Sequence, residues 1–527
     1  MPTIVHPLIL FALATGFAVA HTQSPLFFSN QNQYLLHGLA DSGYGQLSHD
    51  WLANTKDPTP LFSAMVSLGY RIGGLWTLQA IYFLILMGYF ISVWCVVVRL
   101  PGMRASRRTA LGFAAMFTAA HAAIFRYLSV QMTDVDYPWY FQAGVAGQYV
   151  LGAGLQPSVF GVFLVASLAA FANDRPRLAA ALAPLAAVMH PTYLLPAALL
   201  TLGYMAVYLR HRQWRLMFIL GSIALAVALP VVLYTLWKFT PSTTTTFVEA
   251  QRILADVRIP HHTVVGKWLD SIALLQMAWA IAGLVALRKT TLFLPLLVAA
   301  IGAVMLSIIQ VVTRDHTLAL LFPWRVSVIL VPLATAVFAI KLVNMITVGR
   351  ISTILYIVLF IVEVVGGVAI VMLGIGYSMN EEERPVLEYI RNHPANHVYL
   401  IPTRIPPVGT GARGSVSTSF TPPPRPKPGS NLIPVDLQRF RLDTRAAIFV
   451  DFKSVPYADV EVLEWYRRCK LVEAWYKEPD WDRAGLHKQL TAEGITLILI
   501  PRTRAIHASF LDPIYTDDVY IVCRMKP

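Results

Sequence analysis

The chain has 527 residues, of which 56% are apolar and only 13% are charged, and its formal net charge is +13. Soluble domains carry roughly 25% charged residues, so this composition excludes an ordinary soluble protein. The basic residues lie mainly in short connections between apolar segments, which is a membrane-topology pattern and not a nucleic-acid-binding one.

Residues 1–377 contain a series of apolar segments, and a membrane-spanning helix needs about 20 such residues. The segments lie at about 3–21, 73–98, 109–130, 157–173, 177–190, 192–209, 214–237, 268–287, 291–312, 318–342 and 351–377. The two segments that meet at His190-Pro191 are short. We therefore predict an α-helical polytopic membrane protein with about eleven helices, in a range of about ten to twelve.

The first segment has two interpretations. Ala18-Val19-Ala20 resembles a signal-peptidase site, but Met1 to His6 contain no Lys or Arg, which a signal peptide should begin with. We expect a retained first helix.

Connections after the even-numbered segments hold most of the loop Lys and Arg, for example Arg107, Arg212 and Arg288. The positive-inside rule places these connections in the cytoplasm. The acidic and His-bearing connections then face outward. We expect an integral protein of the bacterial inner membrane.

The first outer connection, at 22–72, is long and holds two candidate catalytic residues. Segments 34–39 and 50–53 alternate apolar and polar residues, as interfacial amphipathic helices do. Asp50 precedes Trp51, and partial desolvation beside an aromatic ring raises the basicity of a carboxylate. This suits a base that takes a proton from an acceptor hydroxyl. Asp41 is the alternative base, and a helix cap is the structural interpretation of Asp50.

Polar residues also follow the third and fifth segments on the outer side. Asp134 and Asp136, flanked by aromatic residues, suit a divalent cation (Mg²⁺ or Mn²⁺) or sugar hydroxyls, or form a solvated rim. Gln148 and Tyr149 follow among glycines and are candidates to line a cavity, and His190 is a further candidate for substrate contact. No zinc-type ligand spacing is present.

The outer connection at 238–267 carries a basic group. Arg252 and Arg258 are followed by a Pro-fixed turn with His261 and His262. Arg forks suit phosphate oxygens, and His donates to phosphate or binds a metal. We interpret these four residues as ligand contacts, although a surface loop of a basic protein could carry the same residues without a function.

Further basic residues lie at the next outer boundary, where Arg314 and His316 follow the ninth segment. Arg325, in Phe322-Pro-Trp-Arg, begins the tenth segment, which Pro323 breaks. An ionisable residue in a broken membrane helix is a functional candidate.

Residues 378–527 are expected to form a soluble extracytoplasmic α/β domain. Apolar runs at 397–403, 446–452, 496–502 and 519–525 predict strands, and 459–470 and 482–494 predict helices. The Pro-rich stretch from Thr421 to Gly429 is interpreted as a linker or an acceptor-gripping loop. A disulfide between Cys469 and Cys523 is left open, because sequence does not give their distance.

These features resemble the GT-C superfamily, membrane glycosyltransferases that use polyprenyl-phosphate-linked sugars. The resemblance rests on the helix count, the long first outer connection with Asp41 or Asp50, the Asp134/Asp136 pair, and the outer Arg and His residues. The Asp-Glu pair of protein mannosyltransferases and the Trp-Trp-Asp signature of oligosaccharyltransferases are absent. The resemblance implies sugar transfer, with anomeric inversion, from a polyprenyl-phosphate-sugar donor to a glycan, lipid or protein acceptor.

Three other classes of function are alternatives for a chain of this kind. A transporter or flippase of a lipid-linked or anionic substrate would also have about a dozen helices, but internal repeats and mid-membrane charges typical of transporters are not visible. A membrane acyltransferase would use a His within a helix, such as His121 or His190. An accessory assembly subunit would need none of the acidic residues.

Overall fold

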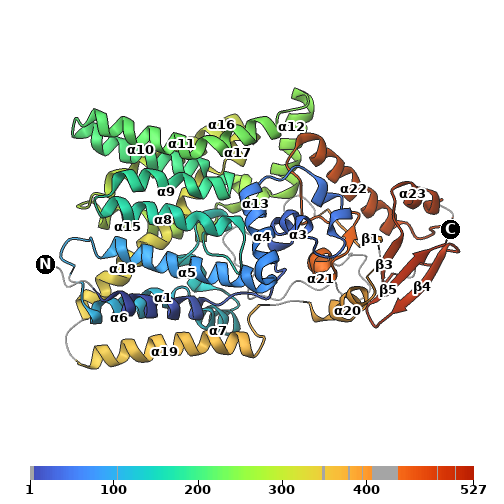
Figure 1. Ribbon diagram of the computed structural model, residues 1–527, viewed down its shortest axis with the longest axis horizontal. Helices are drawn as coiled ribbons and strands as arrows, with labels where there is room; N and C mark the ends of the chain where they lie inside the picture. The colour runs from blue at the N-terminus through green and yellow to red at the C-terminus, as the bar shows by residue number, and fades with distance from the viewer. Residues whose placement is uncertain are drawn as a thin grey trace.

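The computed structural model describes residues 5–103, 105–346, 350–377, 380–394, 396–405, 437–482, 485–504 and 506–526. It consists of a helical bundle with a mixed α/β domain at one end (Figure 1). The Pro-rich stretch from Thr421 to Gly429 lies outside the described residues.

Within the described residues, seven helical segments are long and apolar enough to cross a membrane, and four apolar helices are shorter. The bundle helices are α1 (Pro7–His21), α5 (Leu75–Val97), α6 (Arg107–Ala119), α7 (Ala123–Thr133), α8 (Val162–Ala172), α9 (Pro176–Met189), α10 (Leu194–Arg210), α11 (Trp214–Lys238), α15 (Ser271–Ala286), α16 (Phe293–Thr313), α18 (Ser327–Ile346) and α19 (Arg350–Met372). The predicted break at His190 is confirmed, since His190 ends α9. The number of crossings stays a prediction, because four helices fall short of the usual length.

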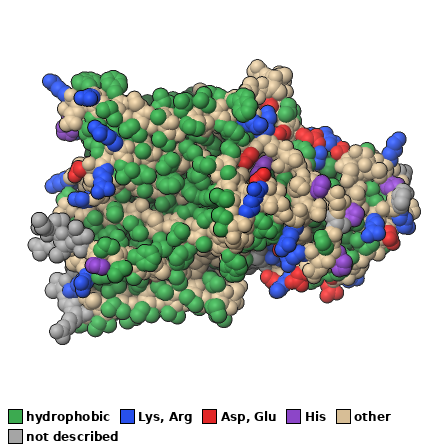
Figure 2. All heavy atoms as spheres, in the orientation of Figure 1, with side chains coloured by type: hydrophobic (Ala, Val, Ile, Leu, Met, Phe, Trp, Pro, Cys, Tyr) green, Lys and Arg blue, Asp and Glu red, His purple; other side chains and the backbone are tan. Residues whose placement is uncertain are grey.

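An apolar belt surrounds the bundle. Exposed large side chains such as Leu225 on α11, Val304 on α16 and Val358 on α19 face outward, and green side chains cover the visible flank of the helices (Figure 2). Charged side chains gather beyond both ends of this flank. A contiguous exposed apolar surface of this kind is unfavourable in water, so the helical part is embedded in a membrane.

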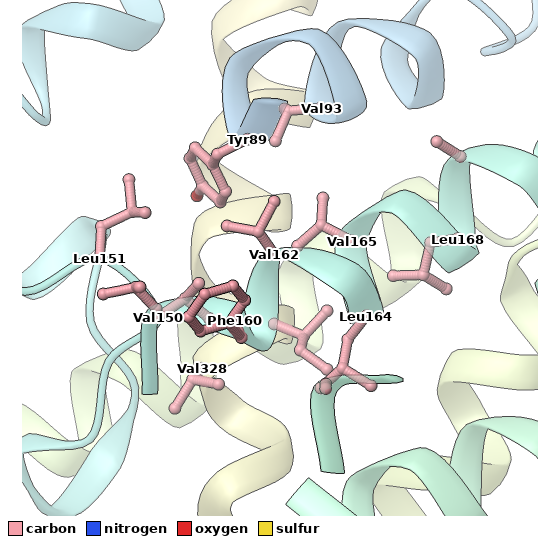
Figure 3. Packing of buried hydrophobic residues seen from close by; sticks show 14 of the residues in the cluster. Tyr89, Val93, Val150, Leu151, Phe160, Val162, Leu164, Val165, Leu168 and Val328 are labelled. Carbon is pink, nitrogen blue, oxygen red and sulfur yellow. The ribbon is translucent and has the colours of Figure 1, made fainter. Parts of the chain in front are cut away.

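The interior of the bundle is packed with aliphatic and aromatic side chains. In Figure 3, α8 presents Val162, Val165 and Leu168 toward Tyr89 and Val93 of α5, while Phe160 lies near Val150 and Val328. All of these residues belong to one buried cluster.

Short helices at the end of the bundle nearest the α/β domain carry the polar residues. The first connection folds into α2 (Gln31–Tyr34), α3 (Leu36–Asp41), the 3-10 turns η1 (Leu47–His49) and η2 (Leu52–Asn54), and α4 (Pro60–Gly73). Later connections form η3 (Tyr137–Phe141), η4 (Val145–Gly147), η5 (Pro157–Gly161), η6 (Pro191–Tyr193), α12 (Thr244–Arg252), η7 (Ile253–Arg258), α13 (Pro260–Thr263), α14 (Val265–Trp268), α17 (His316–Leu320) and η8 (Pro323–Val326).

The C-terminal domain is built on a five-stranded mixed sheet of order β2-β1-β3-β5-β4. Its elements are η9 (Glu381–Glu383), α20 (Arg384–Asn392), β1 (Val398–Leu400), η10 (Leu437–Arg439), α21 (Phe440–Thr444), β2 (Ala447–Ile448), α22 (Asp459–Lys477), α23 (Leu486–Ala492), β3 (Leu497–Pro501), β4 (Leu511–Thr516) and β5 (Tyr520–Met525). β1 pairs in parallel with β2 and β3, and β5 pairs antiparallel with β3 and β4. Each of the four predicted strands is confirmed, and β4 is a strand that the sequence analysis missed.

Cys469 and Cys523 are both buried in the C-terminal domain as free thiols. The disulfide that the sequence left open is not formed in the structure.

Candidate functional site

Arg325 is the centre of the first of two basic groups at the end of the bundle beside the C-terminal domain. Phe322 adopts a positive φ of 50° and Pro323 begins η8, so the chain turns sharply before Arg325. The buried guanidinium donates from Nε to Gln148 Oε1 at 2.8 Å and from another nitrogen to the Thr192 hydroxyl. It also lies 5.1 Å from the ring centre of Tyr193. Two predicted residues, Gln148 and Arg325, are therefore in direct contact.

His190 extends this first group. Its ring meets Tyr34 edge-on at 5.7 Å and Tyr193 at 5.9 Å between ring centres. Tyr149, another predicted residue, is half-buried and its hydroxyl accepts a hydrogen bond from Gln156 at 3.1 Å.

The second basic group comes from η7 and α13. The segment η7 is a π-helix, a local widening that is frequent at functional sites. It ends at Arg258, which is buried, and Pro260 then starts the turn that carries His261 and His262. The two imidazole rings lie 4.1 Å apart, and His262 Nδ1 donates to the Ala146 carbonyl at 2.6 Å.

The two basic groups form one cluster, which we call the basic cluster: His190, Arg258, His261, His262, Arg325 and Lys453. Burial lowers the pKa of His261 to about 2 and that of His262 to about 3, and nearby cations add to both effects. For His262 these cations are Arg325, Lys453 and Arg258. Burial raises the pKa of the Tyr34 hydroxyl, while Arg325 and Arg258 oppose that rise. Cations of both groups thus shift the pKa values of the same residues, Tyr34 and His262.

Two nitrogens of the basic cluster lack partners within the described part of the chain. Arg258 Nε and His190 Nδ1 are both buried and accept or donate no hydrogen bond there. Buried polar atoms are nearly always paired, so such an atom calls for an explanation. A bound anion would supply acceptor oxygens to the Arg258 N–H and compensating negative charge to the whole cluster.

The other predicted basic residues lie outside the basic cluster. Arg252 is half-exposed and pairs with Glu249 at 2.6 Å. His316 pairs with Asp256 at 3.1 Å. Arg314 is exposed at the end of α16, where its φ is 55°. Among the described residues, none of these three makes a hydrogen bond or ion pair with a residue of the basic cluster.

Asp50, the predicted base, lies in a buried ion-pair triad between the two domains, formed by Asp50, Arg441 and Asp451. Arg441 donates to Asp50 Oδ2 and to Asp451 Oδ2, both at 2.7 Å. Asp50 also accepts the N–H groups of Ile448 and Leu52, both at 2.9 Å, and is fully buried. Both carboxylate oxygens of Asp50 are thus occupied and its side chain has no exposure, and its role as a base stays a prediction.

Asp41, the alternative base, is largely exposed. Its carboxylate accepts from Ser67 at 2.6 Å and from Arg71 at 3.2 Å. None of these contacts involves a residue of the basic cluster.

Asp134 and Asp136 do not share one site. Asp134 is exposed at the end of α7 with a φ of 57°. Asp136 is buried, pairs with Arg126 at 2.7 Å, and caps η3. The predicted paired-carboxylate site is therefore divided into a solvated residue and a structural ion pair.

A divalent cation stays a prediction. No group of three His, Cys, Asp or Glu side chains that could hold a metal ion is found in the part of the chain that the structure describes.

A small cleft lies beside Tyr34, between the first connection and the C-terminal domain. Its lining includes Gln33, Tyr34, His37, Thr55, Lys56 and Val455. The half-buried Glu461 accepts the N–H of Lys56 at 3.0 Å, and burial raises the pKa of Glu461. The cleft thus combines hydrogen-bonding side chains with a nearby carboxylate of increased basicity.

The sequence analysis missed Tyr34, Arg441, Lys453 and Glu461. Lys453 and Arg441 flank a predicted strand, and residues that follow a parallel strand often reach a binding site. No feature of the sequence paired them with the membrane part.

Comparisons with known proteins add little to this geometry. Residues 426–472 match the model of a family described as a domain of unknown function (DUF6798), which is a small part of the chain. No curated protein matches the chain. The solved structures include a similar chain, ArnT from Cupriavidus metallidurans bound to undecaprenyl phosphate, with 13% identity, a TM-score of 0.34, and coverage of 98% of this chain and 96% of that one. A TM-score this low does not establish a shared fold.

Proposed function

We propose that this protein is a membrane glycosyltransferase that moves a sugar from a polyprenyl-phosphate donor to an acceptor hydroxyl. The basic cluster carries the proposal, because it gathers two Arg, three His and one Lys side chain from several connections at the end of an apolar helical bundle. The resemblance of the sequence to GT-C enzymes agrees with this proposal.

The chemistry of such a transfer needs a cation-rich site at the membrane boundary. The phosphate of a lipid-linked sugar lies at headgroup level, and negative charge develops on it as the glycosidic bond breaks. Prearranged Arg and His donors stabilise that charge, and a water-poor site strengthens their effect. We assign Arg258 and Arg325 to the phosphate, with His261 beside them; His262 donates from Nδ1 to the Ala146 carbonyl and would have to gain a proton on Nε2 before it could donate to the phosphate as well.

Glu461 is added to the candidate bases for the acceptor hydroxyl. Asp50 and Asp41 were the candidates from sequence, but Asp50 is enclosed in an ion pair and Asp41 is held by Arg71. Glu461 accepts the N–H of Lys56, which lines the small cleft, and its raised pKa suits proton abstraction near neutral pH better than an ordinary carboxylate would.

The orientation belongs to the same proposal. The basic loops at the opposite end of the bundle would be cytoplasmic, and the basic cluster and C-terminal domain would face the outside. The acceptor and sugar are then those available outside the cytoplasm.

Arg258→Met and Arg325→Met test the function in cells. We expect both variants to lose a surface glycan and to accumulate its polyprenyl-linked sugar precursor, as measured by mass spectrometry of extracted lipids. Lys238→Met, a half-buried residue at the end of α11 and outside the basic cluster, is the matched control and should behave as wild type.

Unchanged glycans and lipids in both cluster variants, at normal protein levels, would contradict the proposal. An assay of purified protein in liposomes distinguishes a glycosyltransferase from a flippase. A flippase would move the lipid-linked sugar across the bilayer without forming a new glycosidic bond.

A further inference from the structure

The loop that follows β2 in the C-terminal domain reaches the membrane part. Residues 449–458 connect β2 to α22, at the edge where the parallel strands end. In α/β sheets, ligands bind outside the carboxyl ends of parallel strands. In this protein that edge faces the basic cluster, because Arg258 of η7 donates a hydrogen bond to the Lys453 carbonyl.

The 449–458 loop is fastened to the first connection at both of its ends. Near its start, Asp451 pairs with Arg441, which in turn pairs with Asp50 of the membrane part. Near its end, Gln33 donates to the Tyr457 hydroxyl at 2.9 Å and to the Val455 carbonyl at 3.3 Å. Asp451 also accepts the N–H of Ser454 at 2.6 Å. Lys453 is therefore held on a short, doubly anchored segment.

The charges around Lys453 are almost all positive. Arg258 lies on one side, with its guanidinium 5.6 Å from the ring centre of Phe452. The charge of the Lys453 ammonium also lowers the pKa of His261 and His262. Asp451 is the acidic group that acts on Lys453, and it is already engaged with Arg441 and Ser454. Among the described residues, no hydrogen bond or ion pair is found for Lys453 Nζ.

Burial lowers the pKa of Lys453 to about 7, and Arg258 lowers it further while Asp451 opposes the change. Protonation of a lysine with a pKa of about 7, beside an arginine and two imidazoles, is costly unless an anion is present. A phosphate would reverse that balance, since an opposite charge favours the ammonium form.

We propose that the C-terminal domain completes the phosphate site, with Lys453 as a ligand that becomes protonated when the lipid phosphate binds. This inference rests on the proposed function. The lysine then links occupation of the membrane site to the position of the 449–458 loop.

Proton uptake distinguishes this role from general electrostatic attraction. At pH 8 the second ionisation of a phosphate monoester, near about pH 6, is complete, so the lipid itself takes up no proton. Lys453 is mostly neutral at that pH in the empty site and charged in the occupied one. Binding of undecaprenyl phosphate to the full-length protein in nanodiscs should therefore take up a proton from the buffer.

The experiment is calorimetry of undecaprenyl phosphate binding at pH 8 in two buffers of different ionisation enthalpy. We expect wild type to show proton uptake, and Lys453→Met to bind about 10–100-fold more weakly, as for the loss of one charged hydrogen bond, with that uptake removed. Lys470→Met, an exposed lysine of α22, is the matched control and should keep both affinity and uptake. Lys453→Arg should retain much of the affinity without proton uptake, which shows that the substituted loop is folded.

The outcomes separate the two proposals. If Lys453→Met keeps wild-type affinity and proton uptake while Arg325→Met weakens binding, the role of Lys453 is overturned and the phosphate site stands. If wild type itself does not bind undecaprenyl phosphate, the proposed function fails, and this inference fails with it.

Discussion

Arg325 is the residue on which the proposed phosphate site depends most, because it is buried and oriented by two partners. Gln148 accepts from its Nε and Thr192 from another of its nitrogens, and the guanidinium also lies over Tyr193. A planar guanidinium held in this way can present its remaining N–H groups to phosphate oxygens in a fixed direction.

Substitution of Arg325 should separate charge from geometry. Arg325→Lys keeps the positive charge but loses the planar guanidinium with its several N–H donors. Arg325→Met loses the charge and the donors. We expect undecaprenyl phosphate to bind about tenfold more weakly to the first variant and up to about 100-fold more weakly to the second, as for a charged hydrogen bond of about 1.5–3 kcal/mol. Titration in nanodiscs measures this, and equal affinity of Arg325→Met and wild type would remove Arg325 from the site.

The two imidazoles should make the protein sensitive to acid. The pKa of His261 is lowered to about 2 and that of His262 to about 3. Both imidazoles therefore stay neutral in the folded protein when the pH falls below about 6.5, the ordinary pKa of histidine. The unfolded chain binds more protons in the window from about pH 6.5 down to about pH 3. Stability therefore falls as the pH falls through this window, and is greatest above it.

Replacing both imidazoles tests whether they cause the loss of stability at low pH. The double variant His261→Gln, His262→Gln removes the titration, and we expect its thermal midpoint to change less than that of wild type between pH 7.5 and 5. Differential scanning fluorimetry in detergent measures the midpoint. A wild-type midpoint that rises on acidification would show that the imidazoles are charged in the folded protein.

At the scale of elements, the interdomain ion-pair triad positions the loop after β2. Asp50 comes from the turn between η1 and η2, Arg441 from α21, and Asp451 from the segment after β2. Removing one partner from a buried ion pair leaves an uncompensated charge, which costs about 3–5 kcal/mol.

Asp50→Asn should therefore act through docking of the C-terminal domain. We expect a strongly lowered thermal midpoint and faster proteolysis of the interdomain connection, and Arg441→Met should behave in the same way. Asp41→Asn is the matched control, since its exposed pair with Arg71 is worth about 0–1 kcal/mol. A stable, protease-resistant Asp50→Asn protein that lacks only glycosyl transfer would instead support Asp50 as the base.

At the scale of the whole molecule, two domains share one candidate site. The helical bundle supplies Arg325, His190 and the η7–α13 turn, and the C-terminal domain supplies Lys453 and Glu461. The proposed function requires the site of both domains to lie on the side of the membrane where the donor's phosphate and the acceptor meet, and the orientation of the protein therefore tests that proposal.

Topology can be measured with cysteines introduced one at a time in a Cys95→Ser background, and the same background without an introduced cysteine is the control for the buried thiols of Cys469 and Cys523. Ser48→Cys, in the first connection, should react with an impermeant maleimide added to intact cells. Gln213→Cys, between α10 and α11, should react only after the membrane is permeabilised. Both positions are exposed, so accessibility alone does not separate them. The reverse pattern would contradict an outward-facing site.

Sequence alone determined the features that depend on local pattern. Apolar length predicted the helical segments, Pro191 predicted the break after α9, and β-branched runs predicted four of the five strands of the sheet. Hydrophobicity and turn chemistry act over a few residues, and each of these features can therefore be recognised in a short window of sequence.

Only the tertiary structure decided which ionisable residues meet. Asp50 and Arg441 are 391 positions apart, and their pairing places the candidate base Asp50 in an ion pair between the two domains. Arg258 and Lys453 are 195 positions apart, and their contact brought an unsuspected lysine to the basic cluster. A charged side chain in the sequence looks the same whether it ends in solvent, in an ion pair or at a ligand, because burial and long-range partners are set by how the chain packs.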